Sequence, residues 1–326
     1  MRRRLQGLWL LLLFVLFFQG GCSKTPPPER PKQVINVGYI QIAECAHLYV
    51  ALSQSVFSNE GLDVRLTPLR GGAEILPRVK NGGLDVGFTN VVSMVIENER
   101  AGMPGPQTLK SLGASTYENP THLNHALLVR ADSSIEKVTD LRHEGLRFAV
   151  NTRNNVEELM LRRYLVENKV MPKVFNIQPI PFPDMLAALD TRRVDVVAVV
   201  EPFIVPALSR ASQYRLLAHH YEPEKRETIV ATYAASTDWI NKHQDTAQAL
   251  VRALTAASKF MQENDAATRK IIADFTRISA TDVQSMGLPL FTDELRRSSY
   301  LELIDDMQQF GMITKPLAYD ESILRH

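Results

Sequence analysis

The sequence predicts an α/β protein made of two similar lobes that face each other across a cleft. The main observation is an internal repeat. Residues 73–91 read AEILPRVKNGGLDVGFTNV, and residues 183–201, which lie 110 positions later, read PDMLAALDTRRVDVVAVVE. Each copy has the pattern of an amphipathic helix, a short turn and a hydrophobic–Asp–Val step into a buried strand, and Asp85 matches Asp195.

The same offset holds upstream of these copies. A strand, a helix and a second strand precede each one: Ile35–Ile40 aligns with Gly145–Val150, Ala46–Glu60 with Val156–Val170, and Val64–Leu66 with Val174–Asn176. Right-handed crossovers make the sheet of each βαβαβ half parallel. Ligands of such sheets bind beyond the carboxyl ends of the strands, so two facing lobes place a cleft between two sets of strand ends. The alternative is the helix–strand alternation common to any α/β protein.

The rest of the chain is mostly helical. Further strands are expected at Leu109–Ala114, Ala126–Val129 and Ile229–Tyr233, and helices at Asp245–Asn264, Asp265–Phe275 and Thr292–Phe310. About 100 residues remain after the second copy ends. A first lobe completed by these C-terminal helices explains them, and it requires the chain to cross between the lobes near Thr121–His125 and near Arg226–Tyr233.

The N-terminus has the layout of a secretory signal. Arg2–Arg4 are basic, Leu8–Phe18 are apolar, and Gln19-Gly20-Gly21-Cys22 follow. Eleven helical residues span only about 16 Å, roughly half of a bilayer core. Small residues before a cysteine resemble the bacterial lipobox, although Gln19 stands where leucine is usual. This resemblance implies cleavage before Cys22 and lipidation of its thiol. An ordinary cleaved signal and an uncleaved anchor remain the alternatives.

Composition limits the function classes. Removal of residues 1–21 leaves 34 basic against 36 acidic residues with no charged block, which argues against nucleic-acid binding. The segment KTPPPERP at 24–31 predicts an extended tether. Cys22 and Cys45 are the two cysteines of the sequence. If Cys22 is lipidated, no disulfide forms within the chain, and packing must supply the stability.

Several segments together resemble one family. They are NVGYI, AHLYVA and NEGLDVRLTPLRGGAEIL in the first half, and SIEKVTDLRHEGLRFAV and PDMLAALDTRRVDVVAVVEPF in the second. Over about residues 34–240 they resemble the nitrate/sulfonate/taurine-type substrate-binding proteins of ABC importers, a group that includes binders of thiamine-pyrimidine precursors. The resemblance implies a two-lobed type II periplasmic-binding-protein fold with two hinge crossings.

The resemblance also implies an organisation and a role. The expected parts are a lipoprotein signal peptide (1–21), a Pro-rich tether (22–33), lobe I (34–122 plus 228–326) and lobe II (123–227). The expected role is extracytoplasmic capture of a small polar organic molecule or oxyanion, such as a sulfonate, taurine, nitrate or pyrimidine precursor, and delivery to an ABC permease. We expect a monomer on the periplasmic face of a bacterial membrane, held by lipid at Cys22, without cofactor, catalysis or nucleic acid. The alternatives are a ligand-sensing lipoprotein that signals to a membrane partner, and a pyrimidine-precursor synthase-like enzyme.

Strand ends supply the candidate ligand-binding residues. Backbone N–H groups at helix starts attract acceptors, and glycine permits close approach. The candidates of the first half are Tyr39, Gln41, Glu44, Cys45, His47, Gly72, Thr89 and Asn90. Those of the second half are Thr152, Arg153, Asn154, Asn155, Asp184, Glu201 and Phe203. For each of them, a capping or turn role is the alternative.

Two candidates carry a charge with a specific chemical use. Arg153 can clamp a sulfonate or carboxylate through two parallel hydrogen bonds, or it is a solvated or acid-paired surface arginine. Glu201 ends the apolar strand VDVVAVV. A carboxylate there needs a partner, which is either a ligand ammonium or ring N–H, or an arginine of the protein.

The sequence gives no support for a metal site or for a common catalytic motif. We expect the pair His122 and His125, near a predicted crossing strand, to have neither cysteine nor carboxylate company and therefore to form no metal site, and we place His219-His220 on the surface. Neither a Gly-x-Ser-x-Gly elbow, a Walker loop nor a His-Glu-x-x-His motif is present. Cys45 beside His47 has the composition of a thiol–imidazole pair, but we expect its thiol to pack at the cleft wall.

Overall fold

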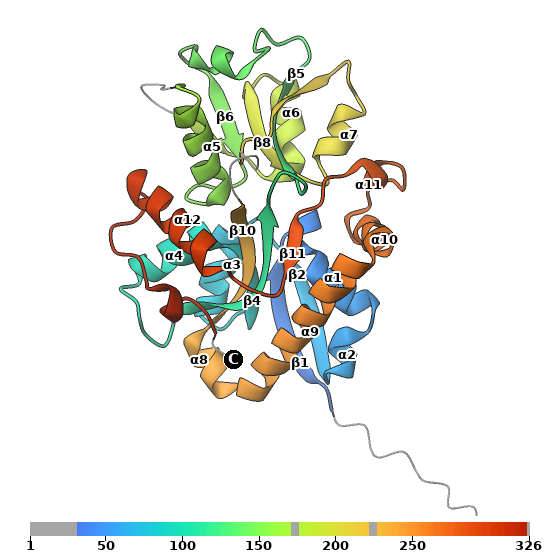
Figure 1. The fold of residues 1–326 in the computed structure, drawn as a ribbon, viewed down its shortest axis with the longest axis vertical. Helices are drawn as coiled ribbons and strands as arrows, with labels where there is room; N and C mark the ends of the chain where they lie inside the picture. Colours follow the sequence, from blue (N-terminus) through green and yellow to red (C-terminus); the bar gives the residue numbers. More distant parts are fainter. Residues whose placement is uncertain (1–30, 171–175, 222–226, 325–326) are drawn as a thin grey trace, which may run out of the picture. The chain divides into compact units, whose positions relative to one another are not determined.

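Two sheets share one strand order, and this order confirms the two-lobed α/β fold. The computed structural model describes residues 31–170, 176–221 and 227–324. One sheet has the order β11-β4-β10-β3-β1-β2, and the other has the order β7-β6-β8-β5-β9. We call the body around the first sheet lobe I and the body around the second lobe II (Figure 1). Apart from the extra edge strand β11, the two orders correspond strand for strand.

The strands of lobe I are β1 (Gln33–Tyr39), β2 (Leu62–Pro68), β3 (Val86–Asn90), β4 (Leu109–Glu118), β10 (Thr228–Ser236) and β11 (Leu290–Thr292). Those of lobe II are β5 (His125–Arg130), β6 (Arg147–Val150), β7 (Asn176–Pro179), β8 (Val196–Val200) and β9 (Tyr214–Ala218). In lobe I, β1, β2 and β3 are parallel, and β10 runs antiparallel between β3 and β4. In lobe II, β6, β7 and β8 are parallel, and β5 runs antiparallel between β8 and β9.

The antiparallel strand of each sheet comes from beyond a crossing. The chain passes from lobe I to lobe II between β4 and β5, and it returns between β9 and β10 (Figure 1). Residues 222–226 of the return lie outside the described residues. Lobe I therefore takes β10 and β11 from beyond the return, whereas all five strands of lobe II lie between the two crossings. The two connections form a hinge.

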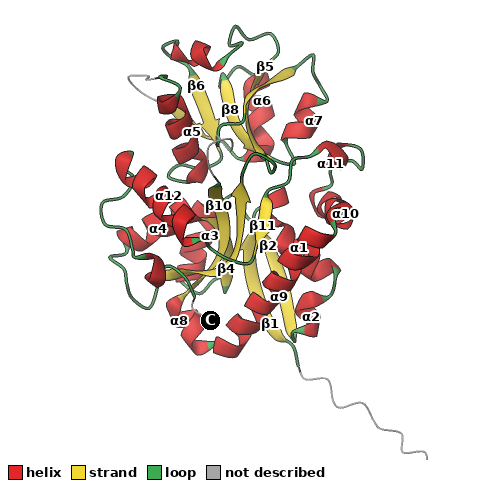
Figure 2. Cartoon of the chain, viewed as in Figure 1, coloured by secondary structure: helices red, strands yellow, loops and turns green. Residues whose placement is uncertain are grey.

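Helices cover both faces of each sheet (Figure 2). They are α1 (Ala46–Ser53), α2 (Val56–Asn59), α3 (Gly72–Lys80), α4 (Val91–Arg100), α5 (Val156–Glu167), α6 (Met185–Asp190), α7 (Ile204–Leu208), α8 (Thr237–Lys242), α9 (Gln244–Glu263), α10 (Asp265–Thr276), α11 (Asp282–Ser285) and α12 (Arg297–Gln309). Four 3₁₀ turns are η1 (Ala43–Cys45), η2 (Val138–Arg142), η3 (Phe182–Asp184) and η4 (Tyr319–Glu321). None of the helices within the described ranges combines the length and the apolar character that crossing a membrane requires.

The fully buried strand β8 shows why its sequence is a continuous apolar run. Val196 and Ala198 belong to the core cluster that includes Leu161 and Leu165 of α5. Val197 and Val199 belong to the cluster that includes the α6 residues. Because successive side chains of a strand point to opposite faces, a parallel strand covered on both faces must be apolar at every position.

Most predicted elements differ from the structure by a few residues at their ends, and three differences have a specific cause or place. The helix expected at Ala46–Glu60 is interrupted, because Ser55 adopts a left-handed backbone conformation (φ 58°) between α1 and α2. The last long helix begins at Arg297, after β11 has ended at Thr292. The strand expected at Val174–Asn176 falls partly outside the described residues, and β7 begins at Asn176.

The repeated aspartates have one structural role in both lobes. Asp85 Oδ2 accepts the backbone N–H of Asn36 at 2.7 Å, and Asp195 Oδ2 accepts that of Arg147 at 2.8 Å. In return, the backbone N–H of Asp85 donates to the carbonyl of Asn36, and that of Asp195 donates to the carbonyl of Arg147. The hydrophobic–Asp–Val step therefore supplies the hydrogen bonds at the point where two parallel strands begin to pair, β1 with β3 in lobe I and β6 with β8 in lobe II. In lobe II, Asp195 also forms an ion pair with the Arg147 side chain at 2.9 Å.

We expect Asp195→Asn to lower the free energy of unfolding by about 1 kcal/mol at pH 7, because Asn keeps the acceptor oxygen and loses the charge. Partial burial raises the pKa of Asp195, but hydrogen bonds from Arg147 outweigh it, and the pKa lies below its usual range. A lowered acid pKa stabilises the fold above the unfolded pKa of about 3.9, and this contribution is lost as the pH falls further. Urea unfolding at pH 7 and pH 3.5 measures the loss.

Asp85→Asn is the matched control, since the Asp85 carboxylate holds the same strand start and its hydrogen bonds come from Asn36 instead of an arginine. We expect a smaller loss for this variant. Equal losses in the two variants, or a loss at Asp195 that does not change with pH, would contradict the role assigned to the ion pair.

Candidate functional site

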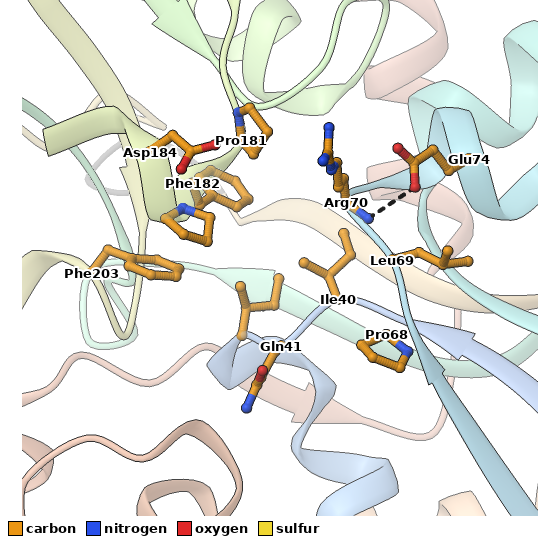
Figure 3. Close-up of a pocket in the computed structure, with 12 residues that line it drawn as sticks. Ile40, Gln41, Pro68, Leu69, Arg70, Glu74, Pro181, Phe182, Asp184 and Phe203 are labelled. Atoms are coloured by element: carbon orange, nitrogen blue, oxygen red, sulfur yellow. Dashed lines mark hydrogen bonds between the residues drawn. The ribbon is translucent and has the colours of Figure 1, made fainter. Parts of the chain in front are cut away.

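The strand ends of the two lobes meet around a cavity of about 390 Å³. Its walls come from the ends of β1 and β2 and the first turn of α3 in lobe I, and from η3 and the segment after β8 in lobe II (Figure 3). The lining residues are Ile40, Gln41, Ile42, Pro68, Leu69, Arg70, Glu74, Pro181, Phe182, Pro183, Asp184 and Phe203. The cavity therefore lies beyond carboxyl ends of parallel strands of both sheets, where ligands of such sheets bind.

The cavity has an apolar side and a few polar groups. The rings of Phe182 and Phe203 lie nearly parallel, 6.2 Å apart and inclined by 22°, and they face Ile40 across the space (Figure 3). The side chain of Gln41 already donates to the carbonyl of Phe275 at 2.6 Å. Mostly apolar walls with a small number of placed polar groups are typical of small-molecule sites.

Beside the cavity, polar groups join the two lobes directly. The Asn90 side chain accepts the N–H of Ser93 at 2.8 Å and the N–H of Val156 at 3.2 Å. One amide oxygen thus caps α4 of lobe I and contacts the first residue of α5 of lobe II. The Ser93 hydroxyl donates to the carbonyl of Asn154 at 3.2 Å. We call this contact the seam.

Glycine permits the close approach at the seam. A Cβ atom added to Gly71 would lie 2.9 Å from the Thr152 side chain, and one added to Gly72 would lie 3.1 Å from Thr89 Oγ1. Both distances are shorter than ordinary van der Waals contact, so a side chain at either position would push its neighbour away.

A cluster of buried charges lies where the chain crosses between the lobes. His125, at the start of β5, has Nδ1 2.6 Å from Glu118 Oε1, and its Nε2 is 3.4 Å from Glu157 and 3.8 Å from Glu44. All four side chains are at most 4% exposed. Burial lowers the pKa of His125, but the carboxylates of Glu157, Glu44 and Glu118 outweigh it and raise the pKa to about 10. The imidazole is therefore a cation at neutral pH.

The carboxyl groups of this cluster differ in the direction in which their pKa is shifted. Burial, opposed by His125, raises the pKa of Glu44 to about 7. The pKa of Glu157 is also raised by burial, but it is lowered overall by His125, by His220 at 2.9 Å and by the Tyr221 hydroxyl at 3.0 Å. Within the described residues, no group of three or more His, Cys, Asp or Glu side chains is arranged to hold a metal ion.

The prediction that His219-His220 lie on the surface was wrong for His220. Its side chain is fully buried, because the segment after β9 turns inward to the Glu157 carboxylate. Sequence reasoning also missed Glu118, Glu157 and His125 as a cluster. The signal was the His122–His125 pair at a predicted crossing, but its carboxylate partners lie 7 to 81 positions away along the chain.

The structure brings some predicted candidates to the cavity or the seam. Gln41, Asp184 and Phe203 line the cavity. Gly72, Thr89, Asn90, Thr152, Asn154 and Asn155 lie at or next to the seam, where Asn155 caps α5 through the N–H of Glu158. Glu44 belongs to the buried cluster, and Tyr39 packs edge-on against Tyr49 at the end of β1.

Two other candidates lie inside lobe I. Cys45 and His47 are both fully buried. His47 packs edge-on against Tyr233 and Phe291, and its Nε2 is 3.2 Å from the carbonyl of Thr292. Burial lowers the pKa of His47 to about 4 and raises that of the Cys45 thiol well above its usual value. These groups are a neutral imidazole and a protonated thiol of the lobe I core.

The two charged candidates have protein partners. Arg153 forms an ion pair with Glu158 at 3.0 Å and donates to the carbonyl of Ile177 at 2.7 Å. Glu201 is 2% exposed, and its Oε2 accepts the N–H of Val205 at 3.3 Å. Burial raises the pKa of Glu201 to about 7 although backbone N–H groups lower it. In the described residues, no arginine or lysine forms an ion pair with Glu201. The role of its carboxylate in the structure is to accept a backbone hydrogen bond at the start of α7.

We expect His125→Gln to lower the free energy of unfolding by about 3–5 kcal/mol, because it leaves buried carboxylates without their cation. A raised histidine pKa gives stability that is fully present below the unfolded pKa of about 6.5 and is lost as the pH rises through 10. The difference from the wild type should therefore shrink between pH 7 and pH 10 in chemical unfolding. His143→Gln, at an exposed loop position, is the control. A small loss that does not change with pH would contradict an imidazolium in the cluster.

Comparison with curated proteins finds relatives in import systems. The nitrate import ATP-binding protein NrtC of a Synechocystis species is 25% identical over 297 residues, which are 85% of this chain and 42% of NrtC. The bicarbonate transport ATP-binding protein CmpC of Synechococcus elongatus is 26% identical over 70% of this chain and 35% of its own length. The chain thus spans less than half of these two relatives.

Solved structures share the fold. The ligand-binding component of an ABC-type import system of Staphylococcus aureus, solved with zinc, superposes with a TM-score of 0.74 at 18% identity over 90% of this chain and 97% of its own. The alkanesulfonate-binding protein SsuA of Xanthomonas axonopodis pv. citri, bound to MOPS, gives 0.73 at 16% identity over 90% and 98%. The desulfurization enzyme DSZB has the same fold, with 0.63 at 14% identity over 90% and 96%.

These likenesses confirm the predicted periplasmic-binding-protein fold. The model of the NMT1-like family matches residues 28–276, which are more than half of the sequence. The chain belongs to the NMT1-like family.

Proposed function

We propose that the protein is an extracytoplasmic solute-binding component that captures a small polar organic molecule or oxyanion between its lobes and delivers it to an ABC permease. The observation that carries this proposal is the cavity lined by strand ends of both lobes beside a two-connection hinge. The import-system relatives support it. The protein would act as a monomer and without a cofactor.

The cavity's side chains favour binding over catalysis. The twelve lining residues include no serine, cysteine, lysine or histidine, and their acidic groups are Glu74 and Asp184. The lining therefore lacks a hydroxyl, thiol or amine nucleophile and an imidazole base. The Cys45 thiol lies outside the lining and is fully buried. Because an enzyme shares this fold, assays for release of product from bound ligands accompany the binding test below.

Closure on a ligand is expected to compact the protein. A thermal-shift screen of sulfonates, taurine, nitrate, amino acids and pyrimidines identifies a ligand, with an expected Kd in the nanomolar to micromolar range (roughly −8 to −12 kcal/mol). Small-angle scattering should then give a smaller radius of gyration with the ligand, because the lobes rotate together about the hinge. Tight binding with an unchanged radius would contradict a closing cleft.

Ser93→Ala is a selective probe of closure, since the Ser93 hydroxyl bonds across the seam to Asn154. Loss of one neutral hydrogen bond should weaken ligand binding by about two- to tenfold. The melting temperature of the ligand-free protein should change little. Ser58→Ala, on the exposed surface of lobe I, is the control.

We also propose that the mature protein is a lipoprotein anchored through Cys22. Residues 1–30 lie outside the described residues, so the proposal rests on the sequence layout of the signal. Cys22→Ser should move the protein from the membrane fraction to a soluble fraction, and mass spectrometry of the wild-type N-terminal peptide should show an acylated cysteine. A soluble wild type that begins at another residue would refute the anchor.

A further inference from the structure

Two charged side chains at the cavity have neither an ion-pair partner nor a hydrogen bond in the described part of the chain. They are the guanidinium of Arg70, which follows β2, and the carboxylate of Asp184, which ends η3. The backbone N–H of Arg70 lies 3.4 Å from Glu74 Oε2, but its side chain makes no such contact. A protein can leave such groups unpaired on a cleft wall at little cost while the cleft is wet, and they are then available to a ligand.

The two groups come from opposite lobes. In Figure 3, Arg70 and Asp184 extend toward the same upper part of the cavity, with Pro181 and Phe182 between them. With Glu74, the lining carries one positive and two negative charges. A ligand with a lone negative charge would gain from Arg70 but would be repelled by Glu74 and Asp184, so the lining favours a ligand of both signs.

The volume of the cavity and its apolar walls suit a ligand that has an apolar part as well as charged groups. A cavity of 390 Å³ is about thirteen times the 30 Å³ that a water molecule takes in the liquid. A four-atom oxyanion such as nitrate would leave most of it to water. The aromatic rings of Phe182 and Phe203 and the side chain of Ile40 offer apolar surface that a hydrocarbon or ring can cover.

From these observations, and on the basis of the proposed function, we propose that the cavity binds an amphipathic zwitterion. Its carboxylate or sulfonate pairs with Arg70, which can form two parallel hydrogen bonds to either group. Its ammonium or protonated ring nitrogen pairs with Asp184. Its apolar body lies against Phe182 and Phe203.

Two sets of matched probes test the charge requirement by calorimetry on the full-length mature protein. The first set is phenylalanine, 3-phenylpropionate and phenethylamine, and the second is homotaurine, propanesulfonate and propylamine. Nitrate is added as a small oxyanion. The zwitterion of at least one set should bind about tenfold or more tightly than either singly charged member, since each charge-assisted bond contributes at least that factor.

Substitutions assign the two ends of the ligand. Arg70→Gln should remove the preference for the zwitterion over the amine, and Asp184→Asn should remove the preference for the zwitterion over the acid. The matched controls are Arg65→Gln and Asp63→Asn on β2, since Arg65 and Asp63 pair with each other on the surface of lobe I. Both controls should leave all affinities within twofold of the wild type.

The outcomes separate this proposal from the proposed function. If nitrate or a singly charged anion binds as tightly as every zwitterion, the zwitterion is refuted while solute binding stands. If a zwitterion binds and neither Arg70→Gln nor Asp184→Asn changes its affinity, the assignment of the charges is refuted. If no probe and no member of the screening panel binds the wild type, solute capture itself fails.

Discussion

The buried imidazolium of His125 constrains how the two lobes meet. Its carboxylate partners come from η1 and β4 on one side of the crossing and from α5 on the other. Each of these carboxylates loses its water on burial, and this cost is recovered only while the cation stays within a few ångströms. Neutral side chains would allow the segments to slide, whereas this arrangement ties the start of α1, the end of β4 and the start of α5 to a single point.

A second buried ion pair reinforces this constraint. Arg163 of α5 contacts Asp306 of α12 at 2.7 Å, and its other nitrogen donates to the carbonyl of Tyr221 at 3.0 Å. It therefore links lobe II, the second crossing and a C-terminal helix of lobe I. The seam is different, because it consists of neutral hydrogen bonds from Asn90 and Ser93 that are individually weak. Both kinds of contact meet at the start of α5, because Val156 of the seam directly precedes Glu157 of the cluster.

The sequence predicted features that depend on short stretches of chain. The repeat predicted the three parallel strands of each sheet, the aspartates at matched strand starts and the strand ends that border the cavity. It did not predict the edge strands β9 and β11 or the antiparallel pairing of β10 and β5. It did not predict the charge cluster, because Glu44, Glu118 and Glu157 come together only through tertiary folding. The burial of His47 also depends on tertiary packing, since the face of α1 that carries His47 packs against α9 and β11. The sequence analysis selected Gly72 as a candidate because glycine permits close approach, and it passed over Arg70, two positions earlier. The structure places Arg70 on the cavity wall.

The repeat also explains why the cavity has two unlike walls. At the offset of 110 residues, Glu74 of α3 corresponds to Asp184, so each lobe presents one carboxylate from the same place in its fold. The residues just before them have diverged. Lobe I has Arg70-Gly71-Gly72, and lobe II has Ile180-Pro181-Phe182. Ile180 is 2% exposed and belongs to the core, whereas Arg70 lies on the cavity wall. The matched positions carry an acid in both lobes, whereas the short turn before them carries a cation in lobe I and an aromatic residue in lobe II. On the proposed function, selection among ligands would depend on this turn, and the cluster at the crossing would be the same for any ligand.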